Sequence, residues 1–370
     1  MLIECWECLL LTSQTSTTLN LKNSNEHQAI NLFAKKFRLS EFLAEKIITL
    51  TAFVSFAFII LIFVFVFREA LPIFSPEEKM VSLIQHGEVQ ETYGDVENSE
   101  PQTQTSVTTL ETSGSEGEAS LSNLSGNNWQ PVSENPKYGL LPLIIGSLKV
   151  TLISIFIAAP IAILAALFTA VFAPTWAKEL LKPAIEILAG FPSVVIGFFA
   201  LIVLATFLQD VFGFEYRLNA IVGGVAMSLA VIPIVYTISE DALTAIPKTL
   251  TEASLALGAT KWQTALFVIL PAATPGIFAA ILLGIGRAFG ETMIALMATG
   301  NAALLSANFA EPIRSMSATI GAEMAEVVFG EVHYNVLFLI GAVLFIFTFS
   351  LNAIAEIYIR QRLMKRFRGQ

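Results

Sequence analysis

The sequence holds few of the residues that build metal sites and nucleophilic centres. It has two cysteines, Cys5 and Cys8, and three histidines, His27, His86 and His333, among 370 residues. Cys5 and Cys8 have the C-x-x-C spacing of many zinc sites, but no second Cys or His pair completes a set of four ligands. The histidines are scattered along the chain, so no nucleophile–base pair can be assembled from them. We therefore expect no metal site and no catalytic residue.

A nucleotide site is also missing. The sequence contains no G-x-x-x-x-G-K-[ST] pattern, and not even one Gly-Lys pair, so no P-loop can cradle the phosphates of ATP. We expect a protein that is not an enzyme and that binds no cofactor itself. Any ATP that drives its work has to be hydrolysed by another chain.

Charged residues are scarce, at 14% of the chain, whereas 55% of the residues are hydrophobic and 29 are Phe. A helix needs about 20 apolar residues to cross a bilayer. Six runs are long enough: 47–67, 142–173, 183–208, 220–238, 272–298 and 336–358. The second run is long for a straight span, which predicts a tilt or a bend at Pro160. The predicted fold class is an all-α polytopic membrane protein with about six transmembrane helices.

Most of the 21 Lys and Arg residues fall on one set of loops. With the N-terminus inside, the outer segments hold only Arg68, Lys79, Lys137, Arg217 and Arg314. Because basic residues favour the cytoplasmic side, a tail at 1–46, the loop at 240–271 and a basic tail at 360–370 are predicted to be cytoplasmic. The first span, 47–67, follows a long tail and precedes no small-residue cleavage site, which favours an uncleaved helix over a signal peptide.

Residues 68–138 form a long polar loop on the predicted outer side, before a core at 139–359 that holds the other five spans. The middle of this loop is rich in Ser, Thr, Gln and Glu and nearly free of aromatic residues. Such a composition cannot bury enough apolar surface to offset the ordering entropy, so partial disorder is predicted. The acidity of the loop would not attract a free anion. We interpret the loop as a solvated spacer; a docking surface for an external partner is the alternative.

Two opposite charges lie within the fifth run. Arg287 and Glu291 are four residues apart, so a continuous helix would place them on one face. Charge within a span is costly and usually faces a bundle interior, a partner charge or a water path. A guanidinium group also suits an oxyanion such as phosphate. We interpret the pair as part of a substrate path, with a purely structural ion pair as the alternative. Lys149, near the outer end of the second run, is expected to snorkel to the membrane interface.

The fifth run also has a small residue at every fourth position. These residues are Gly276, Ala280, Gly284 and Ala288. A strip of this kind lets another helix approach closely. We expect it to pack against a neighbouring helix or a neighbouring subunit.

The loop at 240–271 holds the most specific pattern of the sequence. It reads Glu252-Ala253-Ser254, then Gly258 after three residues and, nine residues later, Val268-Ile-Leu270-Pro271. A short helix is predicted to begin after Pro247 with Thr251 as its N-cap. Gly258 is suited to end that helix in a left-handed conformation. A second short helix is then expected to run to Pro271.

This pattern resembles the EAA loop of ABC importer permeases, with Ser254 in place of an Ala and Val268 in place of an Ile. In that family the loop is a cytoplasmic coupling helix that docks on the ATP-hydrolysing subunit. The resemblance therefore implies the type I ABC importer permease fold. It also implies that the residues which contact the ATPase are Glu252, Ala253, Ser254, Gly258, Leu270 and Pro271.

Within that family the chain resembles the phosphate-transporter branch, and in it the PstC-type subunit. The stretches that carry this resemblance are Trp129–Pro131, Tyr138–Gly146, Ala189–Gly197, Arg287–Met293, Ala298–Asn301, and Ser317–Met324 with His333. The resemblance implies a substrate path for inorganic phosphate that includes Arg287, Glu291 and Thr292. It implies three kinds of partner: a PstA-like second permease, a homodimeric PstB-like ATP-binding subunit and a PstS-like phosphate-binding protein. The implied location is a bacterial inner membrane, surrounded by lipid and with no nucleic acid partner.

Three alternatives stay open at this point. Related permeases carry sulfate, molybdate or phosphonate, and one Arg does not discriminate among oxyanions. A secondary transporter would explain the Arg287–Glu291 pair but not the coupling loop, and it would be expected to show two repeated halves. A membrane-anchored sensor that uses the acidic loop would leave the core at 139–359 unexplained.

Overall fold

The computed structural model describes residues 39–74 and 121–354. The expectations for the first 38 residues, for residues 75–120 of the polar loop and for the basic C-terminal tail lie outside the described residues, as do Cys5, Cys8, His27 and His86. The described residues belong to two compact units that divide between Ile59 and Ile60, and each unit is described by itself.

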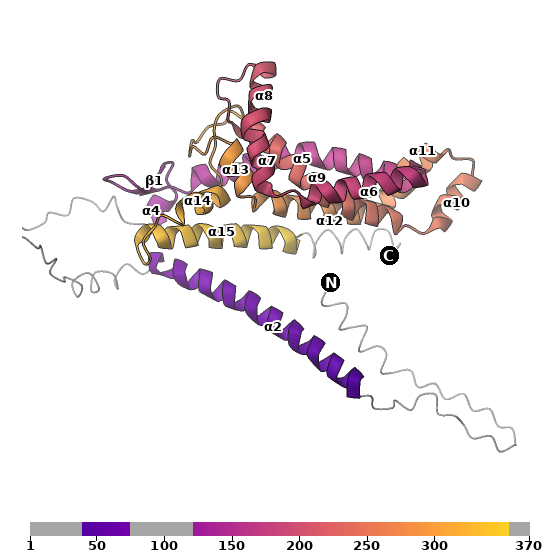
Figure 1. Cartoon of the computed structure of the whole chain (residues 1–370), viewed down its shortest axis with the longest axis horizontal. Helices are drawn as coiled ribbons and strands as arrows, with labels where there is room; N and C mark the ends of the chain where they lie inside the picture. The colour runs from indigo at the N-terminus through magenta and orange to yellow at the C-terminus, as the bar shows by residue number, and fades with distance from the viewer. Residues whose placement is uncertain (1–38, 75–120, 355–370) are drawn as a thin grey trace, which may run out of the picture. The chain divides into compact units, whose positions relative to one another are not determined.

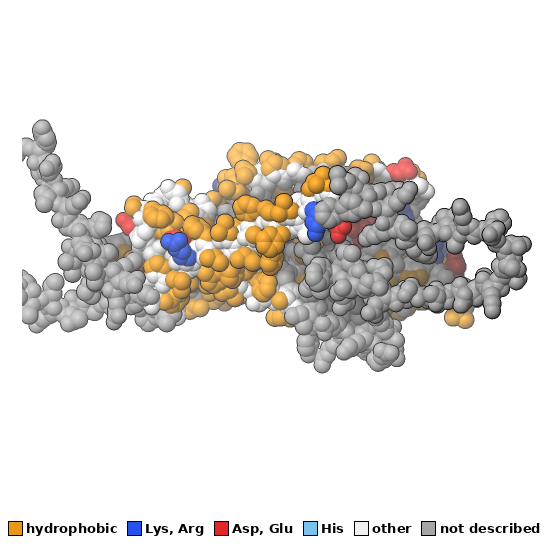
Figure 2. Space-filling model, turned by 90° about the horizontal axis from the view of Figure 1, so that it is seen from below, with side chains coloured by type: hydrophobic (Ala, Val, Ile, Leu, Met, Phe, Trp, Pro, Cys, Tyr) orange, Lys and Arg blue, Asp and Glu red, His pale blue; other side chains and the backbone are white. Residues whose placement is uncertain are grey.

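Six described helical segments are long and apolar enough to cross a membrane, which confirms the predicted fold class. They are Leu43–Phe74, Leu141–Phe172, Ser193–Phe212, Ala220–Thr244, Lys261–Phe289 and Val332–Ile354. Figure 2 shows hydrophobic side chains spread over one face of the molecule, with few charged side chains among them. A surface of this kind is suited to a bilayer and costly in water. The chain is a multi-pass membrane protein.

The first helix, α2 (Leu39–Ala70), runs through the boundary between the two units and continues into a short 3₁₀ turn, η1 (Leu71–Phe74). In the first unit, the side chains of residues 43–59 are all exposed. In the second unit, Phe63 and Phe65 of α2 contact Phe345 and Phe338 of α15 (Val332–Ile354), with ring centroids 5.1 and 5.6 Å apart. The end of α2 is therefore packed on the last span.

Three long helices form the core of the second unit: α5 (Leu141–Leu167), α9 (Ala220–Thr244) and α12 (Leu270–Phe289) (Figure 1). Their contact faces are rich in small residues. A β-carbon on Gly224 of α9 would lie only 2.5 Å from the side chain of Ile153 on α5. Small residues therefore allow the backbones of α5 and α9 to approach closely, as in many membrane bundles. A π-helical turn, η2 (Phe168–Phe172), extends α5 beyond its last α-helical residue.

The small-residue strip of α12 faces α9. A β-carbon on Gly276 would overlap the side chain of Ala242, and one on Gly284 would lie 2.7 Å from Val235. Ala280 and Ala288 are fully buried on the same strip. The neighbour of this strip in the described structure is thus a helix of the same chain.

The predicted third span, 183–208, is wrong in its limits. Its first residues belong to a separate helix, α6 (Thr175–Gly190), which stops before Pro192. The span proper is built from α7 (Ser193–Phe199), the π-turn η3 (Ala200–Leu204) and α8 (Ala205–Phe212). The break has a local cause, because a residue before proline disfavours the α conformation, and Phe191 is extended at ψ 128.

The predicted fifth span, 272–298, is also wrong in its limits. The helix starts earlier, with α11 (Lys261–Thr264) and the π-turn η4 (Ala265–Ile269), and α12 ends at Phe289. A separate short helix, α13 (Met293–Ala298), follows after three residues, 290–292, that are not helical. The apolar run is continuous in sequence but broken in structure.

A small β-hairpin lies at the end of the bundle where α5 begins and α12 ends (Figure 1). After α4 (Leu121–Leu124), strand β1 (Trp129–Gln130) pairs antiparallel with β2 (Lys137–Tyr138), with Trp129 opposite Tyr138. The last two elements at this end are α14 (Met316–Glu323) and the start of α15. One apolar group, which we call the hairpin-end cluster, joins these elements. Its buried members include Ala70, Leu124, Trp129, Tyr138, Leu143, Phe289, Met316, Val336, Leu337 and Ile340.

Candidate functional site

Arg287 and Glu291 flank the end of α12. The expectation that they share one helix face is wrong, because α12 ends at Phe289 and Glu291 lies in the non-helical link before α13. Their charged groups are nevertheless close, with Arg287 Nη2 3.9 Å from Glu291 Oε2. The Arg287 side chain is 48% exposed, whereas the Glu291 side chain is 9% exposed. The pair therefore presents its cation at the surface and keeps its carboxylate inside.

The break that carries Glu291 is held by α14. The hydroxyl of Ser317 donates a hydrogen bond to the backbone carbonyl of Glu291 at 2.7 Å. That carbonyl would lack a partner where the helix stops, and a buried unpaired carbonyl is costly. Gly321, one turn after Ser317, leaves room for Thr292, because a β-carbon there would overlap the Thr292 methyl group. α14 thus fixes the positions of both Glu291 and Thr292.

α14 is in turn fixed by the first residues of α5. The Met316 amide donates to the hydroxyl of Ser147 at 2.9 Å, and Ser315 caps the helix by accepting from the Ala318 amide. A β-carbon on Gly146 would overlap the carbonyl oxygen of Arg314, so α5 and this segment are in direct backbone contact.

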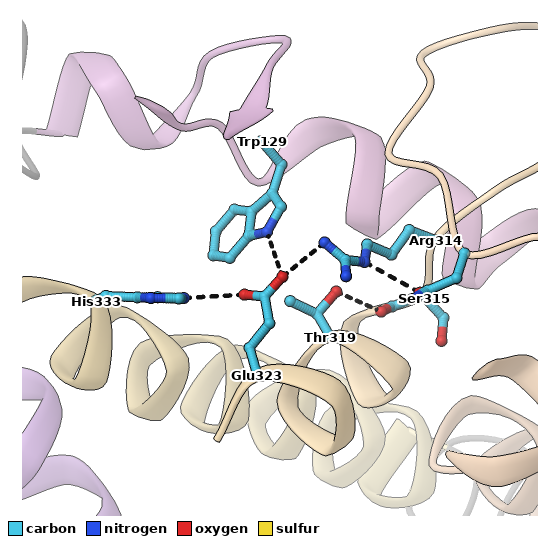
Figure 3. A network of polar contacts seen from close by, with 7 residues as sticks. Trp129, Arg314, Ser315, Thr319, Glu323 and His333 are labelled. Carbon is cyan, nitrogen blue, oxygen red and sulfur yellow. Dashed lines mark hydrogen bonds and ion pairs between the residues drawn. The ribbon is translucent and has the colours of Figure 1, made fainter. Parts of the chain in front are cut away.

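Four side chains from four segments form what we call the Glu323 network (Figure 3). Glu323, at the end of α14, accepts hydrogen bonds from Arg314 Nη1 at 2.6 Å, Trp129 Nε1 at 3.1 Å and His333 Nε2 at 2.9 Å. Arg314 also donates through Nε to Asn301, whose backbone is left-handed at φ 47. The network ties the hairpin, the segment before α14, α14 itself and the start of α15 together.

The surroundings of Glu323 change its acidity. Burial by itself raises the pKa of the Glu323 carboxyl, but the hydrogen bonds from His333 and Trp129 and the charge of Arg314 outweigh it, so the net pKa is lowered. The carboxylate is therefore the stable form in the folded protein.

Lys149 does not snorkel, which corrects the expectation from the sequence. It is 7% exposed, and its ammonium group donates to the backbone carbonyls of Ser306 and Asn308. The same ammonium lies 5.5 Å from the centre of the Phe309 ring, in cation–π geometry. Lys149 therefore anchors the irregular segment that connects α13 to α14.

A second ion pair joins α6 to α9. Lys182 Nζ lies 2.9 Å from Glu240 Oε2, and the Glu240 carboxylate is buried while the lysine is half-exposed. The hydrogen bond to Glu240 and the negative charge of Glu240 together raise the pKa of the Lys182 ammonium group, although burial lowers it.

The loop with the E-A-S…G pattern forms the short helix α10 (Lys248–Ala256), at the end of the bundle opposite the hairpin (Figure 1). Its N-cap is Pro247, so the expectation of Thr251 as N-cap is wrong. None of its nine residues is buried, and Glu252 and Ala253 are exposed. Gly258 ends the turn in the left-handed region at φ 88, as the sequence predicts.

The segment after Gly258 is not a second short helix, because α11 and η4 continue without a break into α12 past Leu270 and Pro271. Thr260 and Gln263 form a capping box at its start. The hydroxyls of Ser254 and Thr264 are hydrogen-bonded at 3.0 Å, which ties α10 to this helix. The loop with the E-A-S pattern is therefore tied to the start of the fifth span.

Sequence reasoning missed the Glu323 network, the anchoring role of Lys149 and the Lys182–Glu240 pair. No spacing signals them, since Trp129 and Glu323 are 194 residues apart and Lys149 and Ser306 are 157 apart. Within residues 39–74 and 121–354, no group of three His, Cys, Asp or Glu side chains is placed to hold a metal ion.

A family model and several known proteins are similar to this chain over more than half of its length. Residues 158–363 match the family model described as "Binding-protein-dependent transport system inner membrane component". The chain is 40% identical over 226 residues to the "Probable ABC transporter permease protein YqgH" of Bacillus subtilis, covering 61% of this chain and 73% of that protein. It is 31% identical over 252 residues to the "Phosphate transport system permease protein PstC" of Mesorhizobium japonicum, covering 63% of this chain and 76% of that protein. Among solved structures, a chain of the MetNI methionine ABC transporter in an inward-facing conformation gives a TM-score of 0.48 at 20% identity, covering 60% of this chain and 95% of that one.

Proposed function

The chain belongs to the family of binding-protein-dependent transport system inner membrane components, the permease subunits of ABC importers, and on that premise we propose that it imports inorganic phosphate. The PstC protein of Mesorhizobium japonicum, one of the relatives of this chain, is named as a phosphate transport permease. In the proposed complex the chain forms half of the translocation path. ATP is hydrolysed by a separate, PstB-like dimer, a PstA-like permease forms the other half, and a PstS-like protein delivers phosphate.

The observation that carries the proposal is the asymmetry of the Arg287–Glu291 pair. The half-exposed guanidinium group offers several N–H donors to an oxyanion, in the fork geometry that phosphate oxygens accept well. The buried carboxylate 3.9 Å away opposes that charge, so a passing anion is attracted without being trapped. Thr292, next to Glu291, is the third member of the proposed path, and its hydroxyl is a further donor.

The helix α10 is the proposed contact with the ATPase. A helix with no buried residue has little to stabilise it in isolation, and it exposes Glu252 and the apolar Leu255, with the exposed Leu257 directly after its end. A partner groove that accepts this small apolar surface would complete its packing. Leu270 and Pro271, at the start of α12, would then carry the movement of α10 into the fifth span.

The proposed orientation places α10 and both termini in the cytoplasm of a bacterial cell and the hairpin end outside the inner membrane. In this arrangement residues 68–138 are extracytoplasmic, and the Glu323 network lies on the side from which the binding protein delivers phosphate. The tails at 1–46 and 360–370 are proposed to be cytoplasmic.

Uptake of labelled phosphate tests this function, in cells that lack other phosphate importers and that express this chain with its partner subunits. We expect uptake that requires this chain and that sulfate, molybdate and phosphonate do not inhibit. Arg287→Ala is expected to lower uptake about tenfold or more, because a charge-assisted contact to the anion is lost. Arg217→Ala is the matched control, since that exposed arginine donates to the backbone carbonyl of Leu201 away from the pair.

Inhibition by sulfate, molybdate or phosphonate would make that oxyanion the substrate of the permease. An assembled, ATP-hydrolysing complex that imports none of these anions would contradict the proposal for phosphate. Equal uptake by the Arg287→Ala and Arg217→Ala variants would contradict the proposed path.

A further inference from the structure

Helix α5 has contacts with the coupling loop at one end and with the segment that begins α14 at the other. It starts beside the hairpin and, with η2, ends at Phe172 near α11 (Figure 1). The backbones of α5 and α9 are in close contact, and close-packed interiors transmit strain, so a displacement at one end of α5 can reach the other across Pro160.

The attachment at the coupling loop is an aromatic contact. The rings of Phe172 in η2 and Trp262 in α11 have centroids 5.7 Å apart at an angle of 40°. The π-turn that holds Phe172 is supported by Lys178, which donates to the carbonyl of Ala170 at 3.3 Å. Trp262 is 55% exposed, so it does not belong to the buried core, and its contact with Phe172 joins two partly exposed segments.

The Ser254–Thr264 hydrogen bond joins α10 to α11, and the Thr260–Gln263 capping box closes the start of α11, the helix that carries Trp262. A push on α10 therefore reaches Trp262, and through the ring contact it reaches Phe172 and α5.

The attachment at the far end is made by backbone contact and a buried hydrogen bond. Gly146 lies against the Arg314 carbonyl, and the hydroxyl of Ser147 accepts from the Met316 amide at 2.9 Å. From Met316 the helix α14 leads directly to Ser317, which holds the backbone of Glu291.

The two charged residues of the proposed substrate path are therefore positioned by different helices. Arg287 is on α12, which continues directly from the coupling loop. Glu291 lies beyond the helix break, and its position depends on α14 and so on α5. A shift of α5 relative to α12 changes the distance between the guanidinium group and the carboxylate.

We propose that α5 is a second mechanical link between the coupling loop and the substrate path, with Trp262 and Phe172 as its positioning residues. This inference rests on the proposed function. In it, movement of the coupling loop displaces both α12 and α5, and the Arg287–Glu291 pair closes or opens as one helix shifts relative to the other.

The test uses the whole complex in proteoliposomes and measures phosphate imported per ATP hydrolysed. Trp262→Ala and Phe172→Ala are each expected to lower this ratio about 2- to 30-fold, the range found for residues that carry coupling between sites. The double variant is expected to be no worse than the worse single variant, because both changes break the same contact. Trp262→Phe, which keeps a ring, is expected to restore most of the ratio.

Ser147→Ala tests the far attachment, and we expect the same loss of ratio with ATP hydrolysis retained. The control is Phe212→Ala, which breaks a stacked pair with Phe214 of similar separation, 5.6 Å, away from the coupling loop. An unchanged ratio in Phe172→Ala and Ser147→Ala, or losses that multiply in the Trp262–Phe172 double variant, would overturn the inference.

Three further outcomes have defined meanings. If Trp262→Ala releases the ATPase subunit, the Phe172→Ala and Ser147→Ala variants decide, since neither residue lies in the coupling loop. If the wild-type complex imports another oxyanion, the phosphate assignment fails, and the same ratios measured with that anion decide the inference about α5. If the wild-type complex imports no anion, both the proposed function and the inference about α5 are wrong.

Discussion

Trp129 Nε1 donates a hydrogen bond to Glu323 Oε1 at 3.1 Å and so joins two residues that are 194 positions apart. The same carboxylate accepts from Arg314 and His333, so one side chain holds three other segments. Loss of these hydrogen bonds has consequences that can be measured.

Glu323→Gln is expected to lower the free energy of unfolding by about 2 kcal/mol, because the largely buried Arg314 loses its countercharge. The measurement is thermal or denaturant unfolding of the purified protein in detergent. Glu326→Gln, at an exposed position three residues later, is the control and is expected to have little effect. Equal stability of the two variants would show that the network contributes nothing.

The stabilisation by Glu323 is expected to depend on pH in one direction. The folded-state pKa of Glu323 lies below its ordinary value of 4.5, so the network contributes fully above pH 4.5. As the pH falls through the lower folded-state pKa, the carboxylate takes up a proton and the contribution is lost.

The difference in melting temperature between the wild-type protein and Glu323→Gln should therefore shrink as the pH falls below 4.5. A difference that grows below pH 4.5 would contradict the assignment of the lowered pKa to this carboxylate.

Gly146→Ala is expected to destabilise the protein by about 1–3 kcal/mol, because the added methyl group overlaps the Arg314 carbonyl and overpacking costs of this size are typical. Gly190→Ala is the matched control, since a β-carbon there meets nothing within 4 Å and alanine is the better helix former. Unfolding in detergent should rank the two variants in that order, and the opposite ranking would exclude the close approach of α5 to Arg314.

Lys149→Met is expected to loosen the segment between α13 and α14, because the carbonyls of Ser306 and Asn308 lose their common donor. Hydrogen exchange followed by mass spectrometry should show faster exchange of residues 303–310 than in the wild-type protein. Lys137→Met, at an exposed position in the hairpin, should leave this segment unchanged. Unaltered exchange in Lys149→Met would mean that other contacts hold the segment.

The sequence predicts the elements that depend on local patterns. Six apolar runs give six candidate spans, and the glycine after the E-A-S pattern gives the left-handed turn at Gly258. These features follow from composition and from the conformational freedom of one residue, which neighbours in sequence suffice to reveal.

The features that were wrong or missed depend on partners distant in sequence. The break at Glu291 lies within an apolar run and is held by Ser317, 26 residues away. Lys149 lies near the end of an apolar run, where a lysine at the membrane interface is expected. It is buried instead, because its ammonium group donates to two backbone carbonyls, those of Ser306 and Asn308. The break before Pro192 differs from these, since the effect of proline on the preceding residue is local and was available from the sequence.

The hairpin-end cluster contains residues from both sides of the segment that the structure does not describe: Ala70 at the end of α2 and Leu124 in α4. The end of α2 and the helix α4 therefore pack in the same apolar cluster. The cluster members that hold Ala70 and Leu124 together all come from described residues, so the described parts of the chain close this end of the membrane core through contacts of their own.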